Sequence, residues 1–440
     1  MKSIHNINDR ISFELIKDCD PSNLFESTLQ FNPPARGPWS IVHVGILVPE
    51  SHQIFVCADG CLRGTVLSAH EGGFENRFST VSVHENNIVD GDLEEQIIEG
   101  CSDVIKRLNY KPRAIEIFSS CLHAFSNCDE EYCNVELRKR FPDILFQDCY
   151  MTPITRNSGI TPDEQMRLKM YSYLEESDEV DNSVAILGNV FSLEKNSELR
   201  RYIDKSSHLY RDITLTKTFD EYKEISKAEF FIYNLPSAEK GAKLLAKRLN
   251  KPLYYSPISY RLNEIKSEDN KLSKLFKVSL DTSETEIMIQ SKITKLQEML
   301  KDFSVAIDYT ATYRVFNLAH FLVENGIKVS TLYVESVPSE DIEDFNYLKE
   351  NCPSIKLISP SSPGALFLHS SETKKNNVLA IGQKAAYFES TENFVNMIEG
   401  NGYQGFDGLL HLLDDIIDAL MNPKDTESII SVKAWGCNCG

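Results

Sequence analysis

The sequence has little positive charge for its length and no long apolar run. Its 440 residues hold 46 Lys and Arg against 65 Asp and Glu, which gives a formal net charge of −19. This charge repels nucleic acids and anionic lipid surfaces, so we expect neither as a partner. No stretch reaches the roughly 18 uninterrupted apolar residues of a membrane helix, and the first residues lack the features of a secretory signal. We therefore predict a cytoplasmic protein.

The chain also lacks a Gly-x4-Gly-Lys-Ser/Thr loop, the usual cradle for nucleotide phosphates, so we predict no ATP site on it. Low-complexity tracts are absent as well. A hydrophobic content of 42% with 10% aromatic residues is typical of a folded globular protein. At about 150 residues per domain, the length allows two to four domains.

Apolar segments rich in Val, Ile and Phe alternate with amphipathic ones, which is the pattern of an α/β fold with parallel sheets. Near the N-terminus we expect strands at 40–49, 53–60, 77–85 and 113–120, and a helix at 93–108. The pattern restarts twice further along the chain. It predicts three flavodoxin- or Rossmann-like domains.

The expected domain boundaries follow from breaker runs and charged stretches. The proline-rich run at 32–38 prevents helix propagation, so compact structure is expected to begin near Trp39. The predicted parts are an N-terminal leader at 1–36, a first α/β domain at 37–178, a second at 179–295 and a third at 296–440.

Eleven cysteines are more than packing usually requires in a chain that we expect in a reducing compartment. Cys57 ends a predicted strand, Cys61 opens a predicted helix, and Cys121 directly follows a third element, the strand at 113–120. Carboxyl ends of parallel strands form ligand crevices, and helix N-termini favour anionic sulfur. The sequence therefore predicts that Cys57, Cys61 and Cys121 bind an iron–sulfur cluster. The Cys-x3-Cys spacing alone leaves simple packing open as the alternative.

The other cysteines have weaker signals. Cys128 could be an additional cluster ligand or a residue with no role in cluster binding, and the sequence leaves both alternatives open. Cys133 is expected to pack in the core. Free cysteines are often buried, so packing roles are also predicted for Cys19, Cys101, Cys149 and Cys352. The roles of Cys437 and Cys439 in the terminal WGCNCG remain open.

Several segments, in order along the chain, resemble the nitrogenase component I family, which includes the molybdenum–iron protein, its assembly scaffold and the dark-operative protochlorophyllide reductase. The most specific is GYQGFDGLLHLLDDIIDALMNP at 402–423. The others are GCLRG at 60–64, ENNIVDGDLEEQIIEG at 85–100 and SSCLHAFSNCDEE at 119–131. The resemblance implies the architecture of nitrogenase component I for most of the chain.

Carried over by position, Cys61 and Cys121 match cysteines that hold a cluster at the subunit interface in this family. The family's earlier cysteine falls where this chain has Phe31 and Asn32, and Cys57 is a candidate to replace it. The resemblance leaves two cluster types open, a single four-iron four-sulfur cluster and a double cluster.

The ligands of the family's catalytic metal cofactor are missing. The expected Cys falls near Asn234 and the expected His near Val395, so reduction of dinitrogen on such a cofactor is not expected. The resemblance makes Asn234 a candidate lining residue of a central cavity, together with Arg156, Tyr260 and Arg261.

The resemblance implies an oxidoreductase, namely the catalytic component of a two-component, ATP-dependent reductase that works under anaerobic conditions. A separate iron–sulfur ATPase would supply low-potential electrons through the interface cluster to an unidentified small substrate. The expected assembly is a homodimer or a heterotetramer with a similar component I subunit. The alternative is a scaffold on which a metal cluster or cofactor precursor is assembled. Two further hypotheses are an electron-storing protein and an ordinary α/β enzyme whose cysteines pack.

Overall fold

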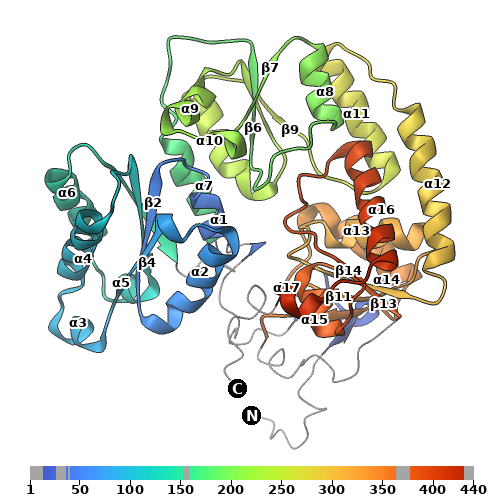
Figure 1. The fold of residues 1–440 in the computed structure, drawn as a ribbon, viewed down its shortest axis with the longest axis horizontal. Helices are drawn as coiled ribbons and strands as arrows, with labels where there is room; N and C mark the ends of the chain where they lie inside the picture. Colours follow the sequence, from blue (N-terminus) through green and yellow to red (C-terminus); the bar gives the residue numbers. More distant parts are fainter. Residues whose placement is uncertain (1–12, 26–35, 38–39, 152–158, 363–376, 431–440) are drawn as a thin grey trace, which may run out of the picture. The chain divides into compact units, whose positions relative to one another are not determined.

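The computed structural model describes the chain except for residues 1–12, 26–35, 38–39, 152–158, 363–376 and 431–440 (Figure 1). Contacts divide the chain into two compact units, and each is described by itself. Unit A comprises the described parts of 33–192 and 207–256, and unit B those of 1–32, 193–206 and 257–440. The predicted domain boundaries remain predictions.

Unit A contains two parallel sheets. The first has the order β3-β2-β4-β5, and every pairing in it is parallel. Its strands are β2 (Ser51–Cys57), β3 (Phe78–Ser82), β4 (Ala114–Ser120) and β5 (Leu145–Met151). The central strands β2 and β4 are buried along their whole length, polar residues included, as expected for the centre of a parallel sheet whose faces are covered by helices.

Helices surround the first sheet. They are α1 (Ile41–Gly45), α2 (Asp59–Gly72), α3 (Glu85–Asp90), α4 (Leu93–Arg107), α5 (Cys121–Phe125), α6 (Glu130–Arg140) and α7 (Pro162–Ser172), with a short 3-10 turn, η4 (Glu75–Arg77). The strand predicted at 40–49 is wrong, because Ile41–Gly45 is helical. A short buried apolar run has the same composition in a strand and in a helix, so periodicity could not separate them.

The second sheet of unit A has the order β7-β6-β8-β9 and is also parallel. Its strands are β6 (Ser183–Leu187), β7 (Leu209–Asp212), β8 (Phe230–Tyr233) and β9 (Leu253–Tyr255). The helical segments are α9 (Phe219–Lys223), α10 (Glu239–Arg248), η6 (Ile213–Leu215), η7 (Glu224–Lys227) and η8 (Pro236–Ala238). One apolar core joins both sheets and includes Phe55 and Phe118, whose rings stack 4.2 Å apart.

Unit B contains the third sheet, in the order β1-β12-β11-β10-β13-β14. Its strands are β1 (Glu14–Leu15), β10 (Ser304–Asp308), β11 (Val329–Tyr333), β12 (Lys356–Ile358), β13 (Val378–Ile381) and β14 (Phe394–Val395). All pairings are parallel except that of β1, which runs antiparallel to β12. Compact structure therefore begins before the expected Trp39, because part of the predicted leader adds a strand to this sheet.

Short helices and turns complete this sheet region: η2 (Ile16–Asp18), α13 (Val315–Glu324), η9 (Ser339–Asp341), α14 (Ile342–Asn351), α15 (Gln383–Glu389) and α17 (Thr426–Ile430). Unit B also holds four further helices, α8 (Glu198–Lys205), α11 (Leu262–Phe276), α12 (Ser283–Met299) and α16 (Gly405–Met421). Helix α16 contacts the other three, and α12 lies alongside it (Figure 1).

Three sheets with surrounding helices, parallel throughout except for strand β1, confirm the predicted α/β class. Among the described helices, none combines the length and the apolar character that crossing a bilayer requires. The carboxyl ends of the strands in the first sheet hold the residues considered next.

Candidate functional site

Cys57, Cys61 and Cys121 come together at the carboxyl edge of the first sheet. Cys57 is the last residue of β2, and Cys121 follows directly on β4 as the first residue of α5. Strands β2 and β4 are parallel neighbours, so their carboxyl ends lie at the same edge of the sheet. Cys61 lies in the first turn of α2, where its N–H donates to the Ala58 carbonyl at 2.9 Å.

Neighbouring sulfurs disfavour the ionisation of Cys57 and of Cys61. Burial raises the pKa of Cys57 to about 12, and the neighbouring Cys61 and Cys121 sulfurs contribute to that rise. Partial desolvation, and then Cys121, raise the pKa of Cys61. Several thiolates gathered in one place need a bound cation to be stable, and bound iron meets that need.

The three cysteine side chains differ in how far they are exposed to solvent. Cys57 is buried, Cys121 is half-buried and Cys61 is exposed. The set therefore reaches from the end of β2 to the surface of unit A. Within the described parts of the chain, no three or more His, Cys, Asp or Glu side chains form a site for a single metal ion. The three cysteines do not form such a site by themselves, and their role as cluster ligands remains a prediction.

Cys128 has a different neighbour. It is half-buried against a core that includes Ile97 and Cys133. The neighbouring Cys133 thiol, followed by desolvation, raises the pKa of Cys128. Its role as a cluster ligand remains a prediction.

The other cysteines have three outcomes. Packing is confirmed for four fully or almost fully buried residues, namely Cys19, Cys101, Cys133 and Cys149. Cys352 is half-buried. Cys437 and Cys439 lie outside the described residues.

Of the four predicted cavity residues, Arg156 lies outside the described residues and Asn234 is buried in unit A. Tyr260 and Arg261 belong to unit B. The Tyr260 hydroxyl donates to the Thr312 hydroxyl at 2.9 Å, and its N–H donates to the Asn317 side-chain oxygen at 2.9 Å. Arg261 is ion-paired with Glu264 at 3.0 Å. Both residues are thus fixed by polar partners.

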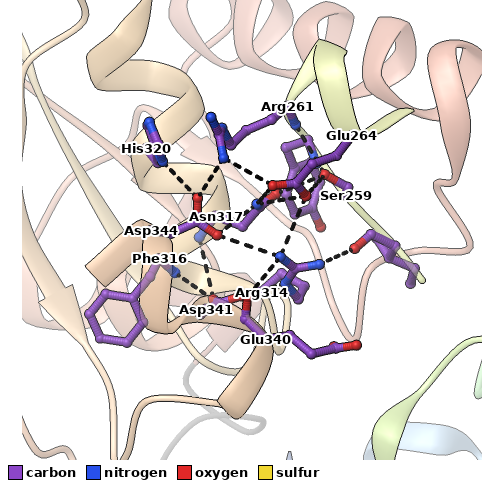
Figure 2. A network of polar contacts seen from close by, with 12 residues as sticks. Ser259, Arg261, Glu264, Arg314, Phe316, Asn317, His320, Glu340, Asp341 and Asp344 are labelled. Carbon is purple, nitrogen blue, oxygen red and sulfur yellow. Dashed lines mark hydrogen bonds and ion pairs between the residues drawn. The ribbon is translucent and has the colours of Figure 1, made fainter. Parts of the chain in front are cut away.

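These partners belong to a buried network around Arg314, shown in Figure 2, which sequence reasoning missed. The Arg314 guanidinium is paired with Asp341 and donates to the Ile258 carbonyl at 2.8 Å. Burial raises the pKa of Asp341 to about 6 despite the Arg314 charge. The signal was present: Arg314, Asn317 and His320 recur at three-residue steps in an otherwise apolar helix, which places them on one face.

On the other side of Asn317, the network continues to Asp344. The Asn317 amide donates to Asp344 at 2.8 Å, and His320 Nδ1 lies 2.6 Å from the same carboxylate. Burial alone would raise the pKa of Asp344, but these hydrogen bonds and the Arg314 charge bring it below its ordinary value. The network therefore holds the segment before α11 against α13 and α14.

The GFDG segment anchors α16. Gly405 has φ +74° and lies so close to Glu198 that an added Cβ would be 2.1 Å from its carboxylate oxygen. The Glu198 side chain, together with Ser259 and Phe406, lines a cavity of about 170 Å³ between α8, α11 and the start of α16. The segment thus has a structural role in unit B.

The comparisons agree with this architecture. The family model for nitrogenase component 1 type oxidoreductases matches residues 44–421. No curated protein matches the chain by sequence. Among solved structures, one described as "Nitrogenase Cp1 at pH 6.5" matches with a TM-score of 0.66 and 17% identity, over 91% of this chain and 96% of the other. Another, "Nitrogenase Cp1 at pH 5", has a TM-score of 0.59 and 14% identity, over 93% of this chain and 94% of the other.

The fold and the extent of the family match define the class as an oxidoreductase of the nitrogenase component 1 type. The chain belongs to that family, which confirms the resemblance seen in the motifs. Members of this family bind metal–sulfur clusters, form oligomers and work with a reductase component.

Proposed function

We propose that this chain is the catalytic component of a two-component, ATP-dependent reductase. It would receive electrons from a separate iron–sulfur ATPase through a cluster held by Cys57, Cys61 and Cys121. The observation that supports the proposal is the convergence of these three sulfurs at one sheet edge, where the neighbouring sulfurs add to the raised pKa of Cys57 and of Cys61. An iron–sulfur cluster, when bound, would supply one-electron transfer at this edge.

Each cysteine would contribute in a different way. Cys57 would approach from the buried end of β2, where its carbonyl accepts from the Val83 N–H at 3.0 Å and fixes the backbone. Cys61 would bind from the first turn of α2, whose helix dipole favours negative charge on sulfur. Cys121 would bind from the start of α5, which the adjacent Ser120 and His123 cap. A four-iron four-sulfur cluster and a double cluster both remain compatible with three sulfur ligands.

The assembly follows from the partial donor set. Three sulfur ligands from one chain are too few to complete a cluster. A second chain related by a two-fold axis would supply the missing ligands most simply, and the two chains would then share the cluster. We therefore propose a homodimer or a heterotetramer with a similar subunit. The ATPase would be a separate protein because this sequence has no phosphate-binding loop.

The proposed substrate is a small molecule other than dinitrogen. Asn234 and Val395, which stand near the positions of the family's cofactor ligands, are both buried and offer neither thiolate nor imidazole. Metal sites of this type depend on those soft or nitrogen donors. The reduction proposed here therefore uses a different substrate-binding chemistry.

The test is anaerobic purification of the full chain, followed by measurement of iron, acid-labile sulfide and electron paramagnetic resonance. The wild type should be brown and contain both elements, whereas Cys61→Ala and Cys121→Ala should lose most of the iron. Cys352→Ala, at a half-buried cysteine in unit B, is the matched control and should keep it. Full iron content in both ligand variants would overturn the assignment. With the ATPase and a reductant, repeated turnover would support a reductase, whereas a single stoichiometric transfer would support a scaffold.

A further inference from the structure

The cavity of unit B between α8, α11 and the start of α16 combines apolar walls with carboxylates. The three helices contact one another, and the cavity between them has a volume of about 170 Å³. Its apolar walls are Leu199, Pro257, Ile265, Leu272 and Phe406. A cavity of about 150 Å³ holds a benzene molecule, so this one has room for a ring of about six carbon atoms.

Glu198 is the most deeply buried carboxyl of the lining, with 3% of its surface exposed. Its Oε1 accepts from the Asp407 N–H at 3.1 Å and lies 3.2 Å from the Arg201 guanidinium. Its Oε2 faces Gly405, which also lines the cavity, and has no hydrogen-bond partner in the part of the chain that the structure describes. A buried oxygen without a donor is costly, so a ligand that donates to it gains binding free energy.

The cavity is acidic overall. Its other charged residues are three carboxylates and one lysine, namely Glu264, Glu268, Asp269 and Lys271. Glu264 is ion-paired with Arg261 at 3.0 Å, and Asp269 accepts from the Tyr202 hydroxyl at 2.8 Å. An excess of carboxylates around apolar walls favours a ligand that joins a positive charge to a hydrocarbon body.

We propose that this cavity binds a small primary amine, whose ammonium group pairs with Glu198 while its hydrocarbon part packs against the apolar walls. The site belongs to unit B, whereas Cys57, Cys61 and Cys121 belong to unit A, so the proposal does not depend on the proposed cluster. A charge-assisted hydrogen bond to Oε2 would supply the donor that this oxygen lacks.

Binding of the amine should be linked to a proton. Burial, followed by the Asp407 charge, raises the pKa of Glu198 to about 8. Without a ligand this carboxyl therefore keeps its proton at neutral pH, and the ammonium group takes the proton's place as the proton leaves to solvent. Burial raises the pKa of Asp269 as well, so its ionisation acts in the same direction. Affinity should accordingly rise from about pH 6 to pH 8.

The test is calorimetric titration of the full chain, purified without air, with two probes of the same ring size. Cyclohexylammonium chloride carries the charge, and cyclohexanol does not. At pH 8 the wild type should bind the amine about tenfold more tightly than the alcohol, and this preference should shrink at pH 6. Equal affinities at pH 8, no binding of the amine, or the same preference at both pH values would overturn the proposal.

Three variants locate the site. Glu198→Gln keeps the shape of the side chain and should lose the preference for the amine. Leu272→Phe keeps the carboxyl but places a larger side chain in the cavity, so it should weaken both probes. Glu284→Gln, the control, makes the same charge change at an exposed position of α12 and should bind as the wild type does.

Circular dichroism shows whether each variant folds. If Glu198→Gln does not fold, Leu272→Phe and the comparison of the two probes on the wild type still decide the outcome. Wild-type affinity for the amine in a folded Glu198→Gln or Leu272→Phe variant would place the amine elsewhere and overturn the proposal.

Discussion

The backbone N–H of Asp407 donates a hydrogen bond to the Glu198 carboxylate, 3.1 Å away and 209 residues earlier in the chain. Arg201 joins the same contact, with a nitrogen 3.2 Å from Glu198 and 2.8 Å from the Asp407 side chain. The most specific family motif of the sequence thus fastens α16 to α8 through a buried, charged contact. Its conformation should accordingly be sensitive to any added atom.

Gly405→Ala should lower the free energy of unfolding by about 1–3 kcal/mol, because its positive φ disfavours a side chain and the Cβ would meet Glu198. Denaturant unfolding followed by circular dichroism measures the change. Gly60→Ala is the control: Gly60 is helical, and no heavy atom lies within 4 Å of its added Cβ. That variant should be neutral or slightly more stable. Equal losses in the two variants would contradict the steric explanation.

Asp341→Ala should destabilise unit B by about 3–5 kcal/mol, because it leaves the buried Arg314 guanidinium without its closest partner. The change also removes the acceptor of the Phe316 N–H, 3.1 Å away at the start of α13. Thermal or denaturant unfolding reports the loss. Glu343→Ala, at an exposed position on α14, should remain close to the wild type. A wild-type stability for Asp341→Ala would show that the network is not needed for folding.

Glu116→Gln should change how stability depends on pH. Burial raises the pKa of Glu116 to about 8 in the folded chain, although the Arg77 charge and a hydrogen bond from Gln53 oppose the rise. The folded chain therefore keeps a proton that the unfolded chain releases above about pH 4.5, so this carboxyl lowers stability as pH rises from about 4.5 to 8. The amide variant lacks that component, so its stability should fall less steeply across this window.

Unfolding midpoints measured at several pH values between 5 and 8 test that prediction. The exposed Glu95→Gln serves as control and should follow the wild-type profile. Parallel profiles for Glu116→Gln and the wild type would show that this carboxyl does not titrate with folding in that range.

Cys57→Ala tests whether this buried cysteine replaces the family's missing ligand. With a thiol removed from the set, we expect lower iron content and an altered electron paramagnetic resonance spectrum in the reduced protein. Cys149→Ala, at a buried residue of β5 in the same sheet and the same apolar core as Cys57, is the control for packing loss. A Cys57→Ala spectrum identical to the wild type would return Cys57 to a packing role.

The sequence predicts the strands best where apolar runs are long and bounded by turns. Strand β2 and strand β10 follow such runs. Helix α13 ends at Glu324, just before Asn325 and Gly326, where Gly326 has φ +73°. Strand β1 could not be predicted in this way. It has two residues, and its pairing with β12 depends on a segment more than 300 residues away.

Some parts of the candidate site could be predicted from the sequence, and others could not. The positions of Cys57 and Cys121 follow from where their strands end, which is a local property of the sequence. The contact between Cys128 and Cys133 depends on where α6 begins, and element boundaries are the least certain part of a sequence-based prediction. The pairing of Arg314 with Asp341 depends on two elements packing together, so composition and periodicity carry no direct signal for it.

Unit B is built from segments far apart in the sequence, so during synthesis on the ribosome its parts become available at different times. The last strand of unit A, β9, ends at Tyr255, whereas unit B needs α16, which begins at Gly405. A nascent chain therefore carries every strand of unit A about 150 residues before the partner of Glu198 is translated. Until then Glu198 lacks its hydrogen bond from the Asp407 N–H, so unit A can fold first and unit B completes its packing only after α16 is made.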